Sequence, residues 1–156
     1  MSYNKSKKTS LIVSLGGLPE SNSLITPKIN NINEYEMSSK SSWMGVFVNH
    51  RPFNELEWIR VNFGIAIGAI ENTLVEPPGG GEYIVLYDNP PSGYLGLGLG
   101  QQVKKGLVFG VDFGLLYGPG PTISGPDDNK IESISNSPLA AKVLPNIQFS
   151  LGFNFN

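Results

Sequence analysis

Apolar residues alternate with small or polar ones along four segments of this chain, 58–70, 94–103, 106–117 and 146–156. Successive strand residues point to opposite faces of a sheet, so a period of two predicts strands with one apolar and one small or polar face. A helix would show a period of 3.6 and would not carry glycine at every second position. The apolar face is expected to hold Ile59, Val61, Phe63, Ile65, Ile67, Leu95, Leu97, Leu99, Leu107, Phe109, Val111, Phe113, Phe149, Leu151 and Phe153.

The strands are long, and their connections alternate in length. Segment 58–70 has thirteen residues, whereas soluble strands have about five or six and membrane-spanning strands about 9 to 11. With two less regular segments, we count six strands: 11–18, 43–50, 58–70, 93–103, 106–117 and 145–156. Short turns at 51–57 and 104–105 and long loops at 19–42, 71–92 and 118–144 are typical of outer-membrane barrels. We expect one domain, 1–156, with 1–10 disordered or the remnant of a leader.

Composition narrows the class of protein and of partner. Charged residues make up 15% of the 156 residues, against about 25% in a typical soluble domain, and there are 19 glycines. Mean hydropathy is only -0.07, and no apolar run reaches the roughly 18 residues of a transmembrane helix. A net charge of -2 argues against a nucleic-acid partner. The absence of cysteine excludes disulfides and thiolate metal sites, and we expect no cofactor.

The second face of the strands distinguishes two architectures. It consists mostly of Gly, Asn, Ser and Gln, which suits the crowded interior of a narrow barrel better than a water-facing surface. The apolar face then meets lipid, and the sheet must close because hydrocarbon cannot satisfy open strand edges. Aromatic residues near strand ends are expected in the interfacial girdles: Trp58, Tyr94, Tyr117 and Phe155. The alternative is a soluble β-barrel, in which the same apolar residues would form a closed core.

Two hairpins and the last strand resemble a known group of proteins. Segments 93–100 and 106–117, together with Leu144-Pro145 leading into 150–155, resemble the closing strands of small proteobacterial and cyanobacterial outer-membrane β-barrel proteins. Segment 49–53 leading into 59–68 resembles their middle hairpin, so the likeness covers about residues 33–156. It implies an eight-stranded barrel and assembly by the barrel assembly machinery, which reads a terminal aromatic residue. This chain ends Phe155-Asn156, and its N-terminal part is expected to be shortened.

Mid-strand polar residues predict a cluster inside the barrel. Arg60 and Asp112 both fall on the polar face, and a charge buried alone is expensive, so we expect them to pair. The residues predicted to surround the pair by hydrogen bonding are Asn62, Gln148 and Asn154.

Other candidate chemistry is weak. His50, the single histidine, with Glu55 or Glu57 would suit a lipid-modifying hydrolase only if a Ser or Glu lay within hydrogen-bond reach of His50. Asp127, Asp128 and Asn129 lack the alternating spacing of a calcium loop, so we expect a solvated loop there.

These observations predict an all-β protein, a small antiparallel up-and-down barrel of the bacterial outer membrane. Its interior is expected to be filled by side chains, which leaves no large pore. The predicted role is structural or interaction-based, in the cell envelope, with the lipid bilayer as surroundings. A soluble barrel that binds a small apolar ligand is the alternative, and an outer-membrane lipid-modifying hydrolase is third.

Overall fold

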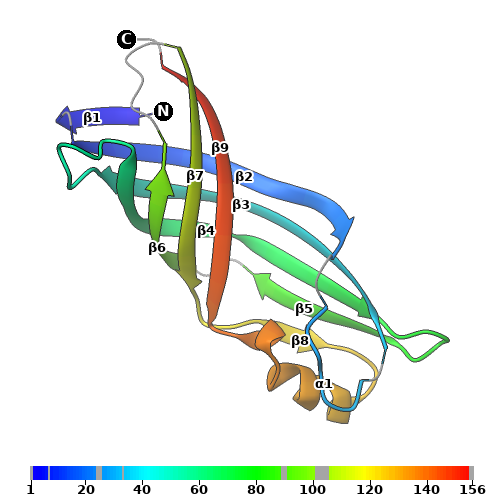
Figure 1. Cartoon of the computed structure of the whole chain (residues 1–156). Coiled ribbons are helices and arrows are strands. Elements are labelled where there is room, and N and C mark those ends of the chain that lie inside the picture. Colours follow the sequence, from blue (N-terminus) through cyan, green and yellow to red (C-terminus); the bar gives the residue numbers. More distant parts are fainter. Residues whose placement is uncertain are drawn as a thin grey trace.

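The computed structural model describes residues 2–6, 8–23, 26–32, 34–88, 91–100 and 106–154, and it describes no side chains for 2–6, 108 and 150–154. Figure 1 shows a long, curled antiparallel sheet with a short α-helix at one end. This confirms the prediction of an all-β, antiparallel fold and gives the sheet the form of a half-barrel.

Nine strands form the sheet, and the six predicted strands correspond to six of them. The strands are β1 (Ser2–Ser6), β2 (Thr9–Asn22), β3 (Glu36–His50), β4 (Ile59–Val75), β5 (Glu82–Asp88), β6 (Ser92–Leu99), β7 (Gly106–Tyr117), β8 (Thr122–Ser124) and β9 (Val143–Asn154). The main path runs β1-β2-β3-β4-β6-β7-β9, while β5 pairs with β4 and β8. Each neighbouring pair is antiparallel, so β9 runs opposite to β2.

The segments expected to be loops contain regular structure. The predicted loop 19–42 includes the end of β2 and the first seven residues of β3. The loop 71–92 includes the end of β4 and all of β5. The loop 118–144 includes β8, helix α1 (Asp128–Ser135) and the short 3-10 helix η1 (Pro138–Ala140). Segment 1–10 contributes β1 and the start of β2, and the turn at 104–105 lies outside the described residues. Short, weakly periodic segments carry too little pattern for sequence reasoning to detect.

Beyond β4, the sheet contains two strand positions that are each divided into two shorter strands, β6 with β5 and β7 with β8, and the two breaks lie side by side. β4 pairs along its first half with β6, from Ile59 to Ala66, and along its second half with β5, from Ala69 to Val75. On the neighbouring side, β7 ends at Tyr117 and β8 begins at Thr122, after Gly118-Pro119-Gly120-Pro121. Proline has no N–H to donate to a ladder, so these breaks follow from the sequence.

Beyond the breaks, the sheet carries a small folded cap. We define the cap as residues 26–32 and 34–38, the end of β4, β5, β8, α1 and η1, which share one hydrophobic cluster. The buried residues of this cluster are Ile29, Ile32, Met37, Leu74, Tyr83, Val85 and Ile134. Asp127 caps α1 by accepting a hydrogen bond from the backbone N–H of Asn129 at 2.9 Å, which satisfies one orphan donor of the first turn.

The two ends of the sheet are strand edges. β1 pairs with β2 only at Thr9 to Ile12, and among the described residues no ladder pairs the outer edge of β9. No helix in the described part of the chain has the length and apolar character needed to cross a membrane.

Candidate functional site

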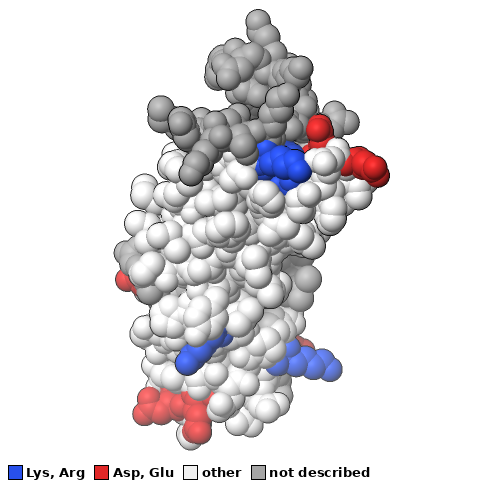
Figure 2. Space-filling view, turned by 90° about the vertical axis from the view of Figure 1, so that its left-hand side faces the viewer, with Lys and Arg blue, Asp and Glu red and all other residues white. Residues whose placement is uncertain are grey.

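The outward face of the sheet carries the predicted apolar residues. Those that are more than a third exposed are Phe63, Ile65, Ile67, Leu95, Leu97, Leu99, Leu107, Phe109, Phe113 and Phe149, with exposures of 40% to 83%. Ile59, Val61 and Val111 are half-buried, and the side chains of Leu151 and Phe153 lie outside the described set. Figure 2 shows that charged side chains gather at the two ends of the molecule and leave the centre of this face uncharged.

Glycines on the opposite, concave face make room for large side chains. A Cβ on Gly96 or Gly114 would lie 2.5 Å from the Tyr94 hydroxyl, and one on Gly64 would lie 2.8 Å from the Phe47 ring. A Cβ on Gly98 would collide with both Arg60 and Asp112. The alternating glycines therefore give the interior its capacity for large polar and aromatic groups.

The structure brings together three of the five residues predicted for the interior cluster. Arg60 donates to Asp112 from Nε to Oδ1 at 3.2 Å and from Nη2 to Oδ2 at 2.6 Å. Asn62 donates to the same carboxylate through Nδ2. Arg60, Asn62 and Asp112 are 8%, 4% and 6% exposed. This fork-shaped pairing is the stronger kind of charge-assisted hydrogen bond.

A polar cavity of about 120 Å³ lies beside this ion pair. Its lining includes Gln148, the fourth predicted residue, and also Ile12 and Ser14 from β2. The fifth predicted residue, Asn154, has no described side chain. Because Gln148 belongs to β9, side chains of the first and last long strands face one cavity.

An aromatic layer separates this polar cavity from an apolar one. The Trp43 and Phe47 rings meet edge to face at 6.1 Å, and the Phe47 and Tyr94 rings do so at 5.6 Å. Phe47 and Tyr94 are 8% and 5% exposed. The prediction that Tyr94 belongs to an interfacial girdle is therefore wrong. Tyr94 has the same strand parity as Gly96 and Gly98, which already placed it on the interior face.

The apolar cavity lies on the other side of this layer, toward the cap. Trp43, Phe47, Tyr87, Leu116 and Leu144 are among its lining residues. The alternation pattern gave no signal for it, because its walls come from strands on both sides of the proline breaks.

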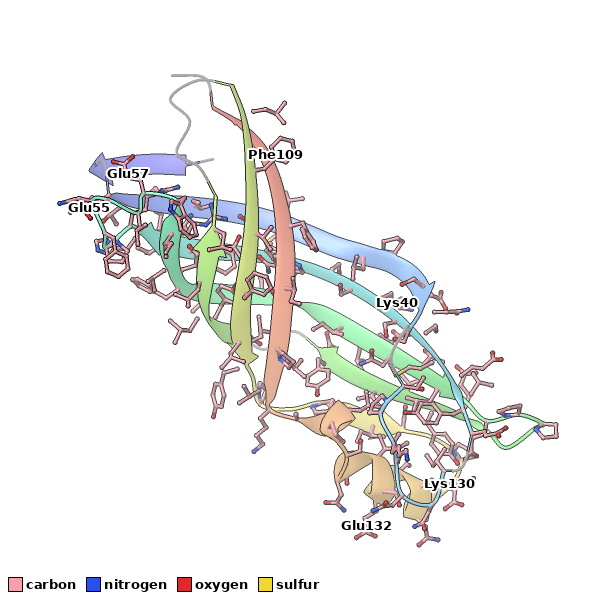
Figure 3. The ribbon with its side chains drawn as sticks, viewed as in Figure 1. Lys40, Glu55, Glu57, Phe109, Lys130 and Glu132 are labelled. Carbon is pink, nitrogen blue, oxygen red and sulfur yellow. The ribbon has the colours of Figure 1, made fainter. Side chains whose placement is uncertain are left out.

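The candidate hydrolase residues are not assembled into a site. The His50 ring bonds the Thr9 hydroxyl through Nδ1 at 3.0 Å, across the β2–β3 pair. Figure 3 shows Glu55 and Glu57 in the turn at the end of the sheet far from α1. Within the described part of the chain, no three His, Asp or Glu residues gather as a metal site would require.

Charges in the cap are paired. Lys130 donates to Glu76 at 2.5 Å, and this hydrogen bond raises the pKa of the Lys130 ammonium above its usual value. The Tyr87 hydroxyl donates to the carbonyls of Leu139 at 2.7 Å and Ala141 at 2.9 Å. Burial raises the pKa of Tyr87 to about 12. Figure 3 places Lys130 at this end of the molecule, with Glu132 beside it on the helix.

Comparison with known proteins identifies the fold. No family model matches the chain, and no curated protein matches it. The crystal structure of Acinetobacter baumannii CarO is similar, with a TM-score of 0.70 and 15% identity over 99% of this chain and 90% of that one. The crystal structure of Acinetobacter baumannii CarO2 is similar too, with a TM-score of 0.66 and 16% identity over 97% of this chain and 89% of that one. At this level of identity the likeness establishes the fold, and the curled antiparallel sheet is that of the CarO barrels.

Proposed function

We propose that this protein is an outer-membrane β-barrel with a structural or interaction role in the cell envelope. The observation that carries the proposal is the inverted arrangement of the two faces: Ile65, Leu97 and Phe149 are 62%, 58% and 83% exposed, while Arg60 and Asp112 are buried. A soluble barrel would place these groups the other way round. The fold shared with the CarO outer-membrane barrels supports the same location.

We further propose that the outer edges of β2 and β9 pair in the bilayer, because open edges are too costly in hydrocarbon. Two features support this closure. β2 and β9 run antiparallel, and their interior side chains face the same cavity. Closure would be completed with the help of the barrel assembly machinery, and the cap would then stand outside the membrane as the surface available to partners.

The location is tested by cell fractionation combined with a gel of boiled and unboiled samples. An outer-membrane barrel stays with the membrane fraction, and its unboiled form migrates differently from the boiled one. A protein in the soluble fraction whose mobility ignores boiling contradicts the proposal.

Closure is tested separately with cysteines, since the natural chain has none. We expect Val13→Cys on β2 to form a disulfide within one chain with a cysteine at Val143, Ile147 or Phe149 on β9. Val13→Cys with Leu97→Cys, on a central strand, serves as the matched control. Cross-links that appear only between two chains contradict closure of a single chain.

A further inference from the structure

The polar cavity beside the Arg60–Asp112 pair contains two buried side-chain atoms that have no hydrogen-bond partner among the described residues. They are Oδ1 of Asn62 and the hydroxyl oxygen of Tyr94, and these residues are 4% and 5% exposed. Both residues line the cavity, which encloses about 120 Å³. A buried polar atom without a partner is costly, and a partner supplied by a bound molecule removes that cost.

Asp112 holds the carboxamide of Asn62 in one orientation. The amide nitrogen Nδ2 of Asn62 donates to Oδ1 of Asp112. A carboxylate only accepts hydrogen bonds, so turning the amide over would place two oxygens against each other. Oδ1 is therefore the end of the Asn62 amide that lacks a partner, and a ligand has to supply a donor to it.

The strand register brings the Tyr94 hydroxyl next to Asn62. Asn62 lies directly opposite Gly96 in the β4–β6 ladder, and Gly96 lies directly opposite Gly114 in the β6–β7 ladder. A Cβ on either glycine would lie 2.5 Å from the Tyr94 hydroxyl, so this hydroxyl stands over the glycine pair. Opposed residues have their Cβ atoms only about 4.5–5.5 Å apart. One small molecule can therefore reach both unpartnered atoms.

The size and the charge of the cavity restrict the class of ligand. A cavity of about 150 Å³ holds benzene, which has six non-hydrogen atoms, so a cavity of about 120 Å³ has room for a slightly smaller molecule. The charges of Arg60 and Asp112 cancel each other, and a further buried charge would stay unpaired at a high cost. The cavity therefore suits a small, neutral, polar molecule.

We propose that this cavity binds a small primary amide. The N–H of the amide donates to Oδ1 of Asn62, and its carbonyl oxygen accepts from the Tyr94 hydroxyl. One rigid molecule satisfies both atoms, whereas water would do so by immobilising several molecules, each at a cost in entropy. Asn49 and Gln148 add two more carboxamides to the wall, which can donate to an amide and accept from it. The proposal goes beyond the outer-membrane role, since it assigns a ligand to the barrel interior.

The glycines of β6 allow binding to be measured at the site. The full-length, isotope-labelled protein is refolded in detergent, shown to be heat-modifiable and titrated with acetamide, while the backbone amide NMR signals of Gly96 and Gly98 are followed. Gly96 lies under Tyr94, and Gly98 lies under the ion pair, whereas a Cβ on Gly93 would meet nothing within 4 Å, so Gly93 is the reference. Two probes have the same shape as acetamide: acetone lacks the N–H donors, and acetamidinium keeps them but carries a positive charge.

We expect acetamide to shift the signals of Gly96 and Gly98 saturably, and acetone and acetamidinium to bind about tenfold more weakly. Asn62→Leu should lower the affinity for acetamide to that for acetone, and it should leave acetone binding unchanged. Tyr94→Phe removes the donor to the carbonyl oxygen, so it should weaken acetamide and acetone alike, by about tenfold. Asn72→Leu is the matched control, because Asn72 accepts from Ser39 away from the cavity, and it should change neither affinity.

Shifts that grow linearly with acetamide and are equal at Gly93 would mean that the cavity holds only water, and they would overturn the site. Acetone or acetamidinium binding as tightly as acetamide would overturn the assignment of a neutral N–H donor. Binding that is indifferent to both Asn62→Leu and Tyr94→Phe would overturn the assigned contacts. If Asn62→Leu fails to fold, Tyr94→Phe, which removes a single oxygen, and the three probes on the natural protein still decide. Because each sample is first shown to be heat-modifiable, none of these failures touches the proposed membrane location.

Discussion

The Arg60 guanidinium holds the Asp112 carboxylate by two parallel hydrogen bonds across the concave face of the sheet. Both side chains are less than a tenth exposed. Removing one partner of a buried pair leaves an uncompensated charge, at a typical cost of about 3–5 kcal/mol. We therefore expect Arg60→Met to lower the free energy of unfolding by about that amount, measured by urea titration of the refolded protein.

The control is a variant that removes both charges and keeps an acceptor for Asn62. Arg60→Met combined with Asp112→Asn should recover much of the stability, since replacing a buried ion pair altogether is often nearly neutral. Lys40→Met, which breaks the exposed pair with Glu71, should cost far less. An Arg60→Met protein as stable as the natural one would show that the ion pair does not stabilise the interior.

Gly98 is required because a side chain there would occupy the space of this ion pair. A Cβ at position 98 would overlap both Arg60 and Asp112, whereas one on Gly93 of the same strand would meet nothing within 4 Å. Gly98→Ala should destabilise the protein by about 1–3 kcal/mol through overpacking. Gly93→Ala should change stability little, and equal losses from the two substitutions would contradict the packing argument.

Ile65 distinguishes a lipid-facing surface from a water-facing one. It is 62% exposed and lies mid-way along β4. In a bilayer, Ile65→Arg should destabilise the folded barrel by about 2–4 kcal/mol, the cost of arginine near the midplane. On a soluble protein the same change would be neutral or would improve solubility. The free energy of unfolding measured in phospholipid vesicles distinguishes the lipid-facing surface from the water-facing one. Phe53→Arg, in the turn before β4, is the control.

Tyr87 makes the protein sensitive to alkali. Its pKa is raised from 10.0 to about 12 in the folded state, so the folded state holds this proton more tightly than the unfolded chain does. The stability that Tyr87 contributes is therefore complete below pH 10 and is lost as pH rises toward 12. Phenolate absorbs near 295 nm, and the absorbance of the Tyr87→Phe variant is subtracted from that of the natural protein. The difference should show one tyrosine titrating near pH 12. A difference curve centred at pH 10 would contradict the burial of this hydroxyl.

Lys130 ties α1 to the turn after β4. Its partner Glu76 is only 9% exposed, so Lys130→Met leaves a largely buried carboxylate without its partner. We expect the cap to open more often, which limited digestion with thermolysin, a protease that cleaves before Ile and Leu, would detect as faster cleavage within residues 118–142. The barrel strands should keep their heat-modifiable behaviour. Lys28→Met, on the same part of the molecule, is the control, and equal cleavage rates in the two variants would argue against the ion pair.

Alternation allowed the strands, the two faces and the Arg60–Asp112 pair to be predicted, because a strict period of two fixes which residues share a face. The same parity implied that Tyr94 points inward, but its place near a strand end suggested a girdle instead. The predicted N-terminal shortening stays a prediction.

The cap could not be predicted, because its hydrophobic cluster joins residues from Ile29 to Ile134. The alternation of apolar and polar residues within one strand carries no information about contacts between such distant residues. Helix α1 has eight residues, with Ile131 and Ile134 as its apolar side. So short a stretch is marginal as a pattern, and it is stable only through its packing and its Asp127 cap.

β3 and β4 run without interruption from the turn at 51–57 to the cap, whereas the next two positions of the sheet beyond β4 are each divided, into β5 and β6 and into β7 and β8. Segment 118–142 connects β7 to β9, and its two flanking residues, Tyr117 and Val143, pair with each other in the β7–β9 ladder. Foreign peptide sequence inserted at the exposed residues 124–126 of this segment would leave the β7–β9 ladder and the buried residues of the cap in place. In the proposed outer-membrane location, the fold is thus suited to carry a foreign peptide on the bacterial surface while the barrel strands remain the same.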